Sequence, residues 1–172
     1  MMCDIVRVLS KMEHSCAISA VGTVQEEIGL RGAQTSAFAV NPDVAIILEV
    51  GIAVDMPGFD KDKVFERLDG GPVIYFYDRS MVPNIRFRDF VLDIAEKNNI
   101  PYQVDFMEGG ATDGGKIHLN ASGVPSIVIG VPTRYIHSHS GIIARKDYDN
   151  AILLLQELIP RLDEKTVAGL YE

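Results

Sequence analysis

Short, near-continuous apolar runs alternate along this chain with segments whose apolar residues recur at helical spacing, and this alternation constrains the fold more than any other feature. Strands that read as unbroken apolar runs are typical of a sheet that helices cover on both faces. The sequence therefore predicts an α/β domain with α/β/α layers and a mostly parallel sheet. The expected strands lie at residues 17–24, 44–50, 73–77, 102–106 and 126–131.

The helical segments fall between these runs. Pro83 favours a helix start and Pro101 a helix stop. A chain of 172 residues is long enough for one domain that buries roughly 70% of its unfolded surface, so we expect residues 1–172 to form a single domain. The expected helices lie at residues 4–13, 32–40, 84–98, 113–122 and 147–161.

Composition excludes several classes of partner. The net charge is −8 and the basic residues are scattered, so no stripe for binding phosphate backbones is present. Cys3 and Cys16 have neither CxxC spacing nor a signal peptide beside them, and no apolar run approaches the ~20 residues of a membrane span. We expect a cytoplasmic protein with neither nucleic acid nor membrane as a partner. The polar stretch at 60–71, with its turn at 69–72, is expected to be a surface connection.

Two consecutive carboxylates, Glu26 and Glu27, directly follow the first apolar run and precede Gly29 and Gly32. The carboxyl ends of strands are where α/β sheets place their ligands. Neighbouring strand residues point to opposite faces, so both carboxylates can reach one site only if the strand ends there, which the glycines favour. The alternative is a solvated pair at a strand end.

Further candidate groups follow later apolar runs. Glu49 closes one run, where a carboxylate would lose hydration and should be paired, protonated or bound to a cation. Asp55 follows in a turn, either as a second site group or as a turn cap. His137 comes just past the last run. Mixed carboxylate and imidazole groups at strand ends suit Zn²⁺ and related divalent ions.

Five segments carry a specific family resemblance. They are TVQEEIGLRGA at 23–33, EVGIAVDMPG at 49–58, GGATDGG at 109–115, GVP at 123–125 and VPTRYIHS at 131–138. In order and spacing they resemble successive signatures of the TET-type glutamyl and deblocking metallo-aminopeptidases, over essentially the whole chain. The resemblance implies a zinc-exopeptidase-like catalytic domain whose substrate is a peptide with a free amino terminus.

The resemblance also implies residue roles. Glu26 matches the family's general base, which takes a proton from a metal-bound water and relays it to the leaving amine. Many relatives have Asp at the position of Glu49, and His139 matches no ligand. The implied metal ligands are Glu27, Glu49 and His137, and the residues on segments around the substrate pocket are Thr112, Asp113 and Arg134.

The family pattern has further parts upstream that this sequence does not contain. Relatives carry a His-x-Asp pair, a bridging Asp, the first strands of the catalytic domain and an inserted dimerisation domain, whereas this sequence opens at Met1-Met2-Cys3. The match therefore covers the carboxy-terminal half of the catalytic domain. A complete family site holds two zinc or cobalt ions, and at most one is expected here. An exposed sheet edge on the amino-terminal side should favour a homo-oligomer.

Three functions remain open at this point. The first is an aminopeptidase segment that is active only when completed, and the second is an inactive or regulatory fragment that keeps the fold. Glycoside hydrolysis, as in an endoglucanase, also uses carboxylate pairs, but the chain has no Trp to line a sugar cleft.

Overall fold

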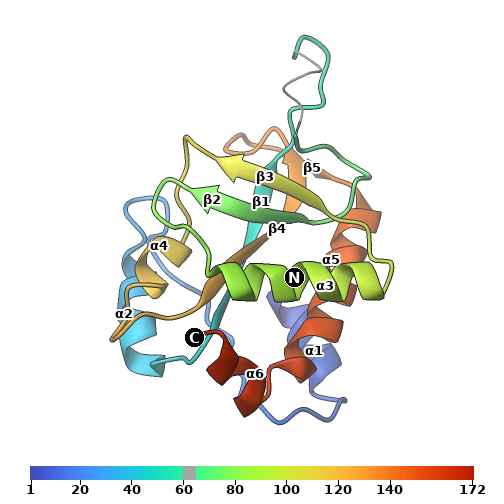
Figure 1. Ribbon diagram of the computed structural model, residues 1–172. Helices are drawn as coiled ribbons and strands as arrows, with labels where there is room; N and C mark the ends of the chain where they lie inside the picture. Colours follow the sequence, from blue (N-terminus) through green and yellow to red (C-terminus); the bar gives the residue numbers. More distant parts are fainter. Residues whose placement is uncertain (60–64) are drawn as a thin grey trace.

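The computed structural model describes residues 1–59 and 65–172, and in these ranges a five-stranded sheet forms the centre of the molecule (Figure 1). The strands lie in the order β1-β4-β2-β3, with the short β5 paired to β4. Their bounds are β1 (Ala45–Ile52), β2 (Val73–Asp78), β3 (Gln103–Met107), β4 (Ser126–Arg134) and β5 (Ile142–Ile143).

Two parallel ladders are joined by a shorter antiparallel one. β1 pairs with β4 in parallel from Ala45↔Ser126 to Ile52↔Thr133, and β2 pairs with β3 in parallel. β2 and β4 run antiparallel over three residue pairs. Most paired residues belong to the parallel ladders, which confirms the predicted α/β fold with a mostly parallel sheet.

Helices cover both faces of the sheet, as Figure 1 shows. One face packs its isoleucines against the apolar sides of α1, α3 and α5, and this is the larger core. The other face packs against Met81 and Ile117, which lies in α4, and α2 lies beside α4. The helices are α1 (Met2–Leu9), α2 (Arg31–Val40), α3 (Ile85–Lys97), α4 (Gly114–Ile117), α5 (Arg145–Leu158), the 3-10 helix η2 (Ile159–Arg161) and α6 (Glu164–Gly169). Within the described ranges, none of them is long and apolar enough to cross a membrane.

The sequence predictions succeed where apolar runs are long. Residues 126–134 form the central strand β4, in which every residue up to Thr133 is buried, so an unbroken apolar run is required there. The helix predicted at 84–98 is α3, whose start is capped by the Asn84 side chain accepting from the Phe87 N–H at 2.9 Å. The helix predicted at 147–161 corresponds to α5 and η2.

Other predicted elements differ from the structure. Residues 17–24 form no strand, because their backbone joins no ladder and most of their side chains are exposed. The helix predicted at 113–122 is only the four residues of α4, and the first helix ends at Leu9 rather than at residue 13. Within the predicted connection at 60–71, residues 60–64 lie outside the described residues.

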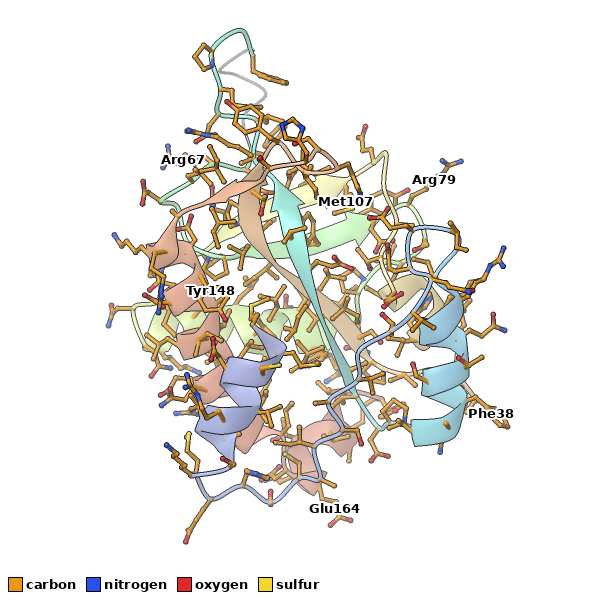
Figure 2. All side chains as sticks on the ribbon, turned by 180° about the vertical axis from the view of Figure 1, so that it is seen from behind. Phe38, Arg67, Arg79, Met107, Tyr148 and Glu164 are labelled. Atoms are coloured by element: carbon orange, nitrogen blue, oxygen red, sulfur yellow. The ribbon has the colours of Figure 1, made fainter. Side chains whose placement is uncertain are left out.

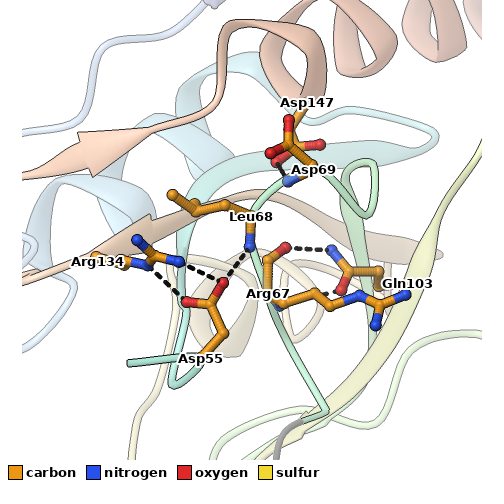
Figure 3. A network of polar contacts seen from close by, with 7 residues as sticks. All are labelled: Asp55, Arg67, Leu68, Asp69, Gln103, Arg134 and Asp147. Atoms are coloured by element: carbon orange, nitrogen blue, oxygen red, sulfur yellow. Dashed lines mark hydrogen bonds and ion pairs between the residues drawn. The ribbon is translucent and has the colours of Figure 1, made fainter. Parts of the chain in front are cut away.

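The end of this connection is fixed by hydrogen bonds rather than loose (Figure 3). Asp147, in the first turn of α5, accepts the N–H groups of Asp69 and Gly71 at 2.8 Å each. The Gln103 side chain accepts from the Arg67 N–H at 3.0 Å and donates to the Arg67 carbonyl at 2.9 Å. Residues 67–71 are therefore a well-anchored return into β2.

Just before this return, Glu66 is fully buried. Its Oε2 accepts the Tyr75 hydroxyl at 2.9 Å, while Oε1 has no hydrogen-bond partner among the described residues. The carboxyl group lies directly over Gly51, where an added Cβ would come within 1.8 Å of Oε1. Burial, with the nearby charge of Asp105, raises the pKa of Glu66 to about 7.

A second close contact shapes the entrance to α2. The Gly32 N–H donates to the Val24 carbonyl at 2.9 Å, and a Cβ on Gly32 would lie 2.4 Å from the Val24 nitrogen. The obstacle is backbone, which cannot turn aside as a flexible side chain can. Gly32 is therefore needed for the chain to pass from Val24 through the turn into α2.

Replacing Glu66 with Gln should remove a pH dependence of stability. The pKa of Glu66 rises from its ordinary 4.5 to about 7 in the folded protein. Protonated Glu66 therefore contributes its full share to the free energy of unfolding below pH 4.5, and this contribution is lost as the pH rises through 7. Above pH 7 the variant should have a higher free energy of unfolding, by on the order of 3 kcal/mol. Urea unfolding at several pH values measures this. The exposed control Glu108→Gln should leave the curve unchanged.

Replacing Gly32 with Ala should lower the free energy of unfolding by about 1–3 kcal/mol, because the new methyl group overlaps the Val24 backbone. The control is Gly22→Ala, since a Cβ there meets nothing within 4 Å. That variant should change stability by no more than about 0.5 kcal/mol. Equal effects of the two substitutions in denaturant unfolding would contradict the contact.

Candidate functional site

The two consecutive carboxylates project from a turn, not from a continuing strand. Gln25 and Leu30 have positive φ angles of 58° and 56°, which reverse the chain on either side of the pair. The N–H groups of Gly29 and Leu30 donate to the Glu26 carbonyl at 3.1 and 2.9 Å and close the turn. The turn allows Glu26 and Glu27 to face one region, as the glycine pattern predicted.

Asp113 lies against the extended segment that leads into this turn. The Thr23 hydroxyl donates to its Oδ2 at 2.5 Å, while the buried Oδ1 has no hydrogen-bond partner among the described residues. Asp113 is only 7% exposed. A buried carboxylate oxygen without a donor is costly, and this one lies beside other carboxylates.

Glu49 lies within β1, three residues before the strand ends at Ile52. The prediction that Glu49 closes its strand is therefore wrong: β4 continues to Arg134 and keeps pairing with β1 up to Ile52. Burial first, and then the negative charges of Glu26, Asp113 and Glu27, raise the pKa of Glu49 to about 7.

Glu26 belongs to the same electrostatic cluster. Its pKa is raised by burial first and then by the charges of Asp113 and Glu27, while His137 acts in the opposite direction. Repulsion among these carboxylates means that the site favours protons or another cation over four free negative charges. Glu26, Glu27, Glu49 and Asp113 all line one large groove of about 1200 Å³.

His137 lies across from the paired glutamates. Its φ is +58° and that of Tyr135 is +63°, so the loop after β4 reverses sharply there. The His137 Nε2 lies 3.2 Å from the Glu27 Oε1, and both side chains are largely exposed. The two side chains thus meet on the solvent side of the cluster.

The remaining predicted residues are held by other partners. Arg134 makes a two-pronged ion pair with Asp55, at 2.7 and 2.8 Å, and Asp55 also accepts the Leu68 N–H at 3.1 Å (Figure 3). This pairing lowers the pKa of Asp55. The Thr112 hydroxyl is buried and donates to Asp78 at 2.7 Å. Asp55 therefore positions Arg134.

Glu26, Glu27, Glu49 and Asp113 line one groove, and His137 lies beside Glu27. Within the described residues, however, no three His, Cys, Asp or Glu side chains are close enough to hold a metal ion. The predicted convergence of the ligands stays a prediction. The sequence analysis placed Asp113 on a segment around the substrate pocket without an individual role. The signal that could have singled it out is its position directly after the GGAT segment.

Comparison with known proteins gives consistent matches. The chain is 35% identical over 168 residues to the glutamyl aminopeptidase of Lactococcus lactis subsp. cremoris, covering 98% of this chain and 46% of that protein. The crystal structure of a TET aminopeptidase from a marine sediment archaeon (Thaumarchaeota) matches with a TM-score of 0.95 and 47% identity, over 98% of this chain and 48% of that one. The Pyrococcus horikoshii TET1 peptidase, described as assembling into a tetrahedron or a large octahedral shell, matches with a TM-score of 0.65 and 28% identity, over 81% and 40%.

The chain thus spans about half the length of the relatives it matches. The model of the M42 glutamyl aminopeptidase family matches residues 1–154, which is most of the sequence. The chain belongs to the M42 glutamyl aminopeptidase family.

Proposed function

We propose that this chain forms one half of the catalytic domain of a metal-dependent aminopeptidase, which releases amino-terminal residues from peptides. The observation that carries the proposal is the position of Glu49, half-buried among Glu26, Glu27 and Asp113, with a pKa raised to about 7. Such a cluster is unfavourable unless cations compensate it. Membership in the M42 family supports the view that this cluster of carboxylates belongs to a peptidase site.

The donor groups fit a divalent ion such as zinc or cobalt. Carboxylate oxygens and an imidazole nitrogen are the ligand types that zinc prefers outside thiolate sites. The buried Oδ1 of Asp113, which has no hydrogen-bond partner among the described residues, supports a cation nearby. Glu27, Glu49 and His137 would hold the ion. When bound, it would polarise the scissile carbonyl as a Lewis acid and lower the pKa of a coordinated water.

The other site residues would handle protons and substrate. Glu26 is partly exposed and makes no ion pair among the described residues, so its carboxylate can take a proton from water and return it to the leaving amine. Asp113 offers a negative charge for a free amino terminus. Arg134, fixed by Asp55, would face the substrate carbonyl side, and Thr112 would shape the pocket through Asp78.

The extent of the chain limits what it does alone. It spans about half of each relative, so we propose that residues 1–172 are a partial catalytic domain that holds at most one metal ion, weakly. Exposed apolar side chains such as Phe38 and Ile18 would favour self-association, in line with the assemblies described for the Pyrococcus horikoshii peptidase. Cys3 and Cys16 are both free, which fits a reducing cytoplasm.

Titration with Zn²⁺ and Co²⁺ tests the metal site. We expect one weak binding event, and the substitutions Glu27→Gln, Glu49→Gln and His137→Ala should each weaken it at least about tenfold, because each removes a ligand and even residues that only orient ligands contribute about that much. His139→Ala is the matched control, since this exposed imidazole two residues away has no ligand role and should not affect affinity. Calorimetry measures the affinity, and elemental analysis measures the number of bound ions.

Turnover of amino-acyl anilides tests the activity. The chain alone should show little turnover, and any turnover should disappear in Glu26→Gln. The proposed site would be wrong if the three ligand variants bound metal as tightly as the unaltered chain. Two tightly bound ions with Glu26-dependent turnover in the chain alone would instead contradict the one-ion limit and favour a complete enzyme.

A further inference from the structure

The turn that carries Glu26 and Glu27 is closed by its own backbone, through hydrogen bonds that lie within residues 24–32. These bonds fix the shape of the turn but not its place over the sheet. Most side chains of residues 17–30 are exposed, and Glu27 meets His137 between two largely exposed side chains. Within the described part of the chain, a single hydrogen bond joins residues 17–30 to anything beyond the turn and α2. The place of both carboxylates therefore depends on few contacts.

Two contacts from one short segment, residues 112–115, reach this turn. At its start, the Thr23 hydroxyl donates to the Asp113 Oδ2 at 2.5 Å, which is the single hydrogen bond just described. At its end, Leu30 is buried, and a Cβ on Gly115 would lie 3.6 Å from the Leu30 Cδ1. The same segment therefore contacts both ends of the turn.

This segment is itself fixed to the end of β2. The Asp78 carboxylate is 1% exposed, and its Oδ2 accepts the Thr112 hydroxyl at 2.7 Å. Its Oδ1 accepts both the N–H and the hydroxyl of Ser80, each at 2.7 Å. The Arg79 N–H donates to the Gly110 carbonyl at 2.9 Å, and Figure 2 shows Arg79 on the same side of the molecule as α2. The end of β2 thus holds the loop that leads to the turn.

Two glycines allow the end of β2 and α4 to come close together. A Cβ on Gly115 would lie 2.0 Å from the Ser80 Oγ, and one on Gly114 would lie 2.8 Å from the Met81 Cε. The Ser80 hydroxyl cannot turn aside without leaving its bond to Asp78. The join between β2 and α4 is therefore tightly packed and gives the loop little freedom to shift.

Asp113 has one carboxylate oxygen that the bond to Thr23 does not use. This Oδ1 is buried and has no hydrogen-bond partner among the described residues. The Thr23 hydroxyl needs only an acceptor, which the amide oxygen of an asparagine would also supply. The bond alone thus does not require a carboxylate, and Asp113 lines the same groove as Glu26. One side chain therefore both contacts the turn and borders the groove.

We propose that Thr23 and Asp113 form a tether, the hydrogen bond between their side chains, that positions the two glutamates of the turn. Through Thr112, the buried Asp78 anchors this tether. Asp78 does not line the groove, so it acts on the site only through the loop. The tether itself rests on the contacts above, whereas its importance for the site rests on the proposed function.

Thr23→Val tests the tether, because it removes the donor and leaves a side chain of similar shape. With chelator present, the amides of Gly29 and Leu30 should exchange at least about tenfold faster than in the unaltered chain, because the turn is held less firmly. The nuclear Overhauser contact between the Glu27 side chain and the His137 ring, whose polar atoms lie 3.2 Å apart, should be lost. Thr23→Ser keeps a donor and should retain both signals.

Variants of Thr112 test the anchor. Thr112→Val should speed exchange of the same amides, although the lost hydroxyl bonds to Asp78 and not to the turn. Thr112→Ser should leave exchange unchanged, and Thr112→Ala is measured in parallel so that one poorly folding variant does not decide the result. The matched control is Thr35→Val, because the Thr35 hydroxyl bonds to the Gly32 carbonyl within α2 at 3.1 Å. This control should leave both signals unchanged.

Binding of Co²⁺ connects the tether with the proposed function. In Thr23→Val the visible absorption spectrum of bound Co²⁺ should change and the affinity should fall at least about tenfold, and Thr23→Ser should behave like the unaltered chain. Unchanged amide exchange in Thr23→Val, or equal changes in Thr35→Val, would overturn the tether. Faster exchange with an unchanged Co²⁺ spectrum and affinity would overturn its positioning role. If the unaltered chain binds no Co²⁺, the proposed function fails, while the two metal-free measurements still decide the tether.

Discussion

The parallel pairing of β1 with β4 is the interaction on which the rest of the structure depends. It runs over eight residue pairs and joins β4, the most completely buried strand of the described sheet, to the strand that carries Glu49. Because the two strands point the same way, the loop after β4 emerges near the end of β1. That loop carries His137, so the register of one ladder brings an acid and an imidazole from distant parts of the sequence toward one edge.

Two buried or half-buried acids lie along one face of β1. Glu49 and Gly51 lie on the same side of β1, because side chains two residues apart share a face. Glu49 meets the carboxylates of the groove, whereas Gly51 is covered by the buried carboxyl of Glu66. Burial raises the pKa of both acids to about 7. The two differ in surroundings: Glu66 is enclosed with a tyrosine hydroxyl, and Glu49 opens onto a groove.

Sequence patterns predicted the parts of the fold that depend on local or fully buried residues. The apolar run of β4 and the helix at 84–98 were predicted because burial and helical spacing leave a direct mark on residue type. Residues 17–24 were predicted as a strand and are not one, because pairing depends on a neighbour that no local pattern specifies. The turn at Glu26 was predicted from its glycines. The position of Glu49 inside its strand was not, because the length of β1 is set by its ladder with β4.

The anchoring of the return loop by Asp147 has a practical consequence for labelling the molecule. Connections are usually the preferred places to insert an epitope or a fluorescent group, but the backbone at Asp69 and Gly71 donates into a fully buried carboxylate of α5. An insertion there would withdraw two donors from Asp147 and disturb the first turn of that helix. Gly22 and Gly169, around which an added Cβ meets nothing within 4 Å, are safer attachment points on this chain.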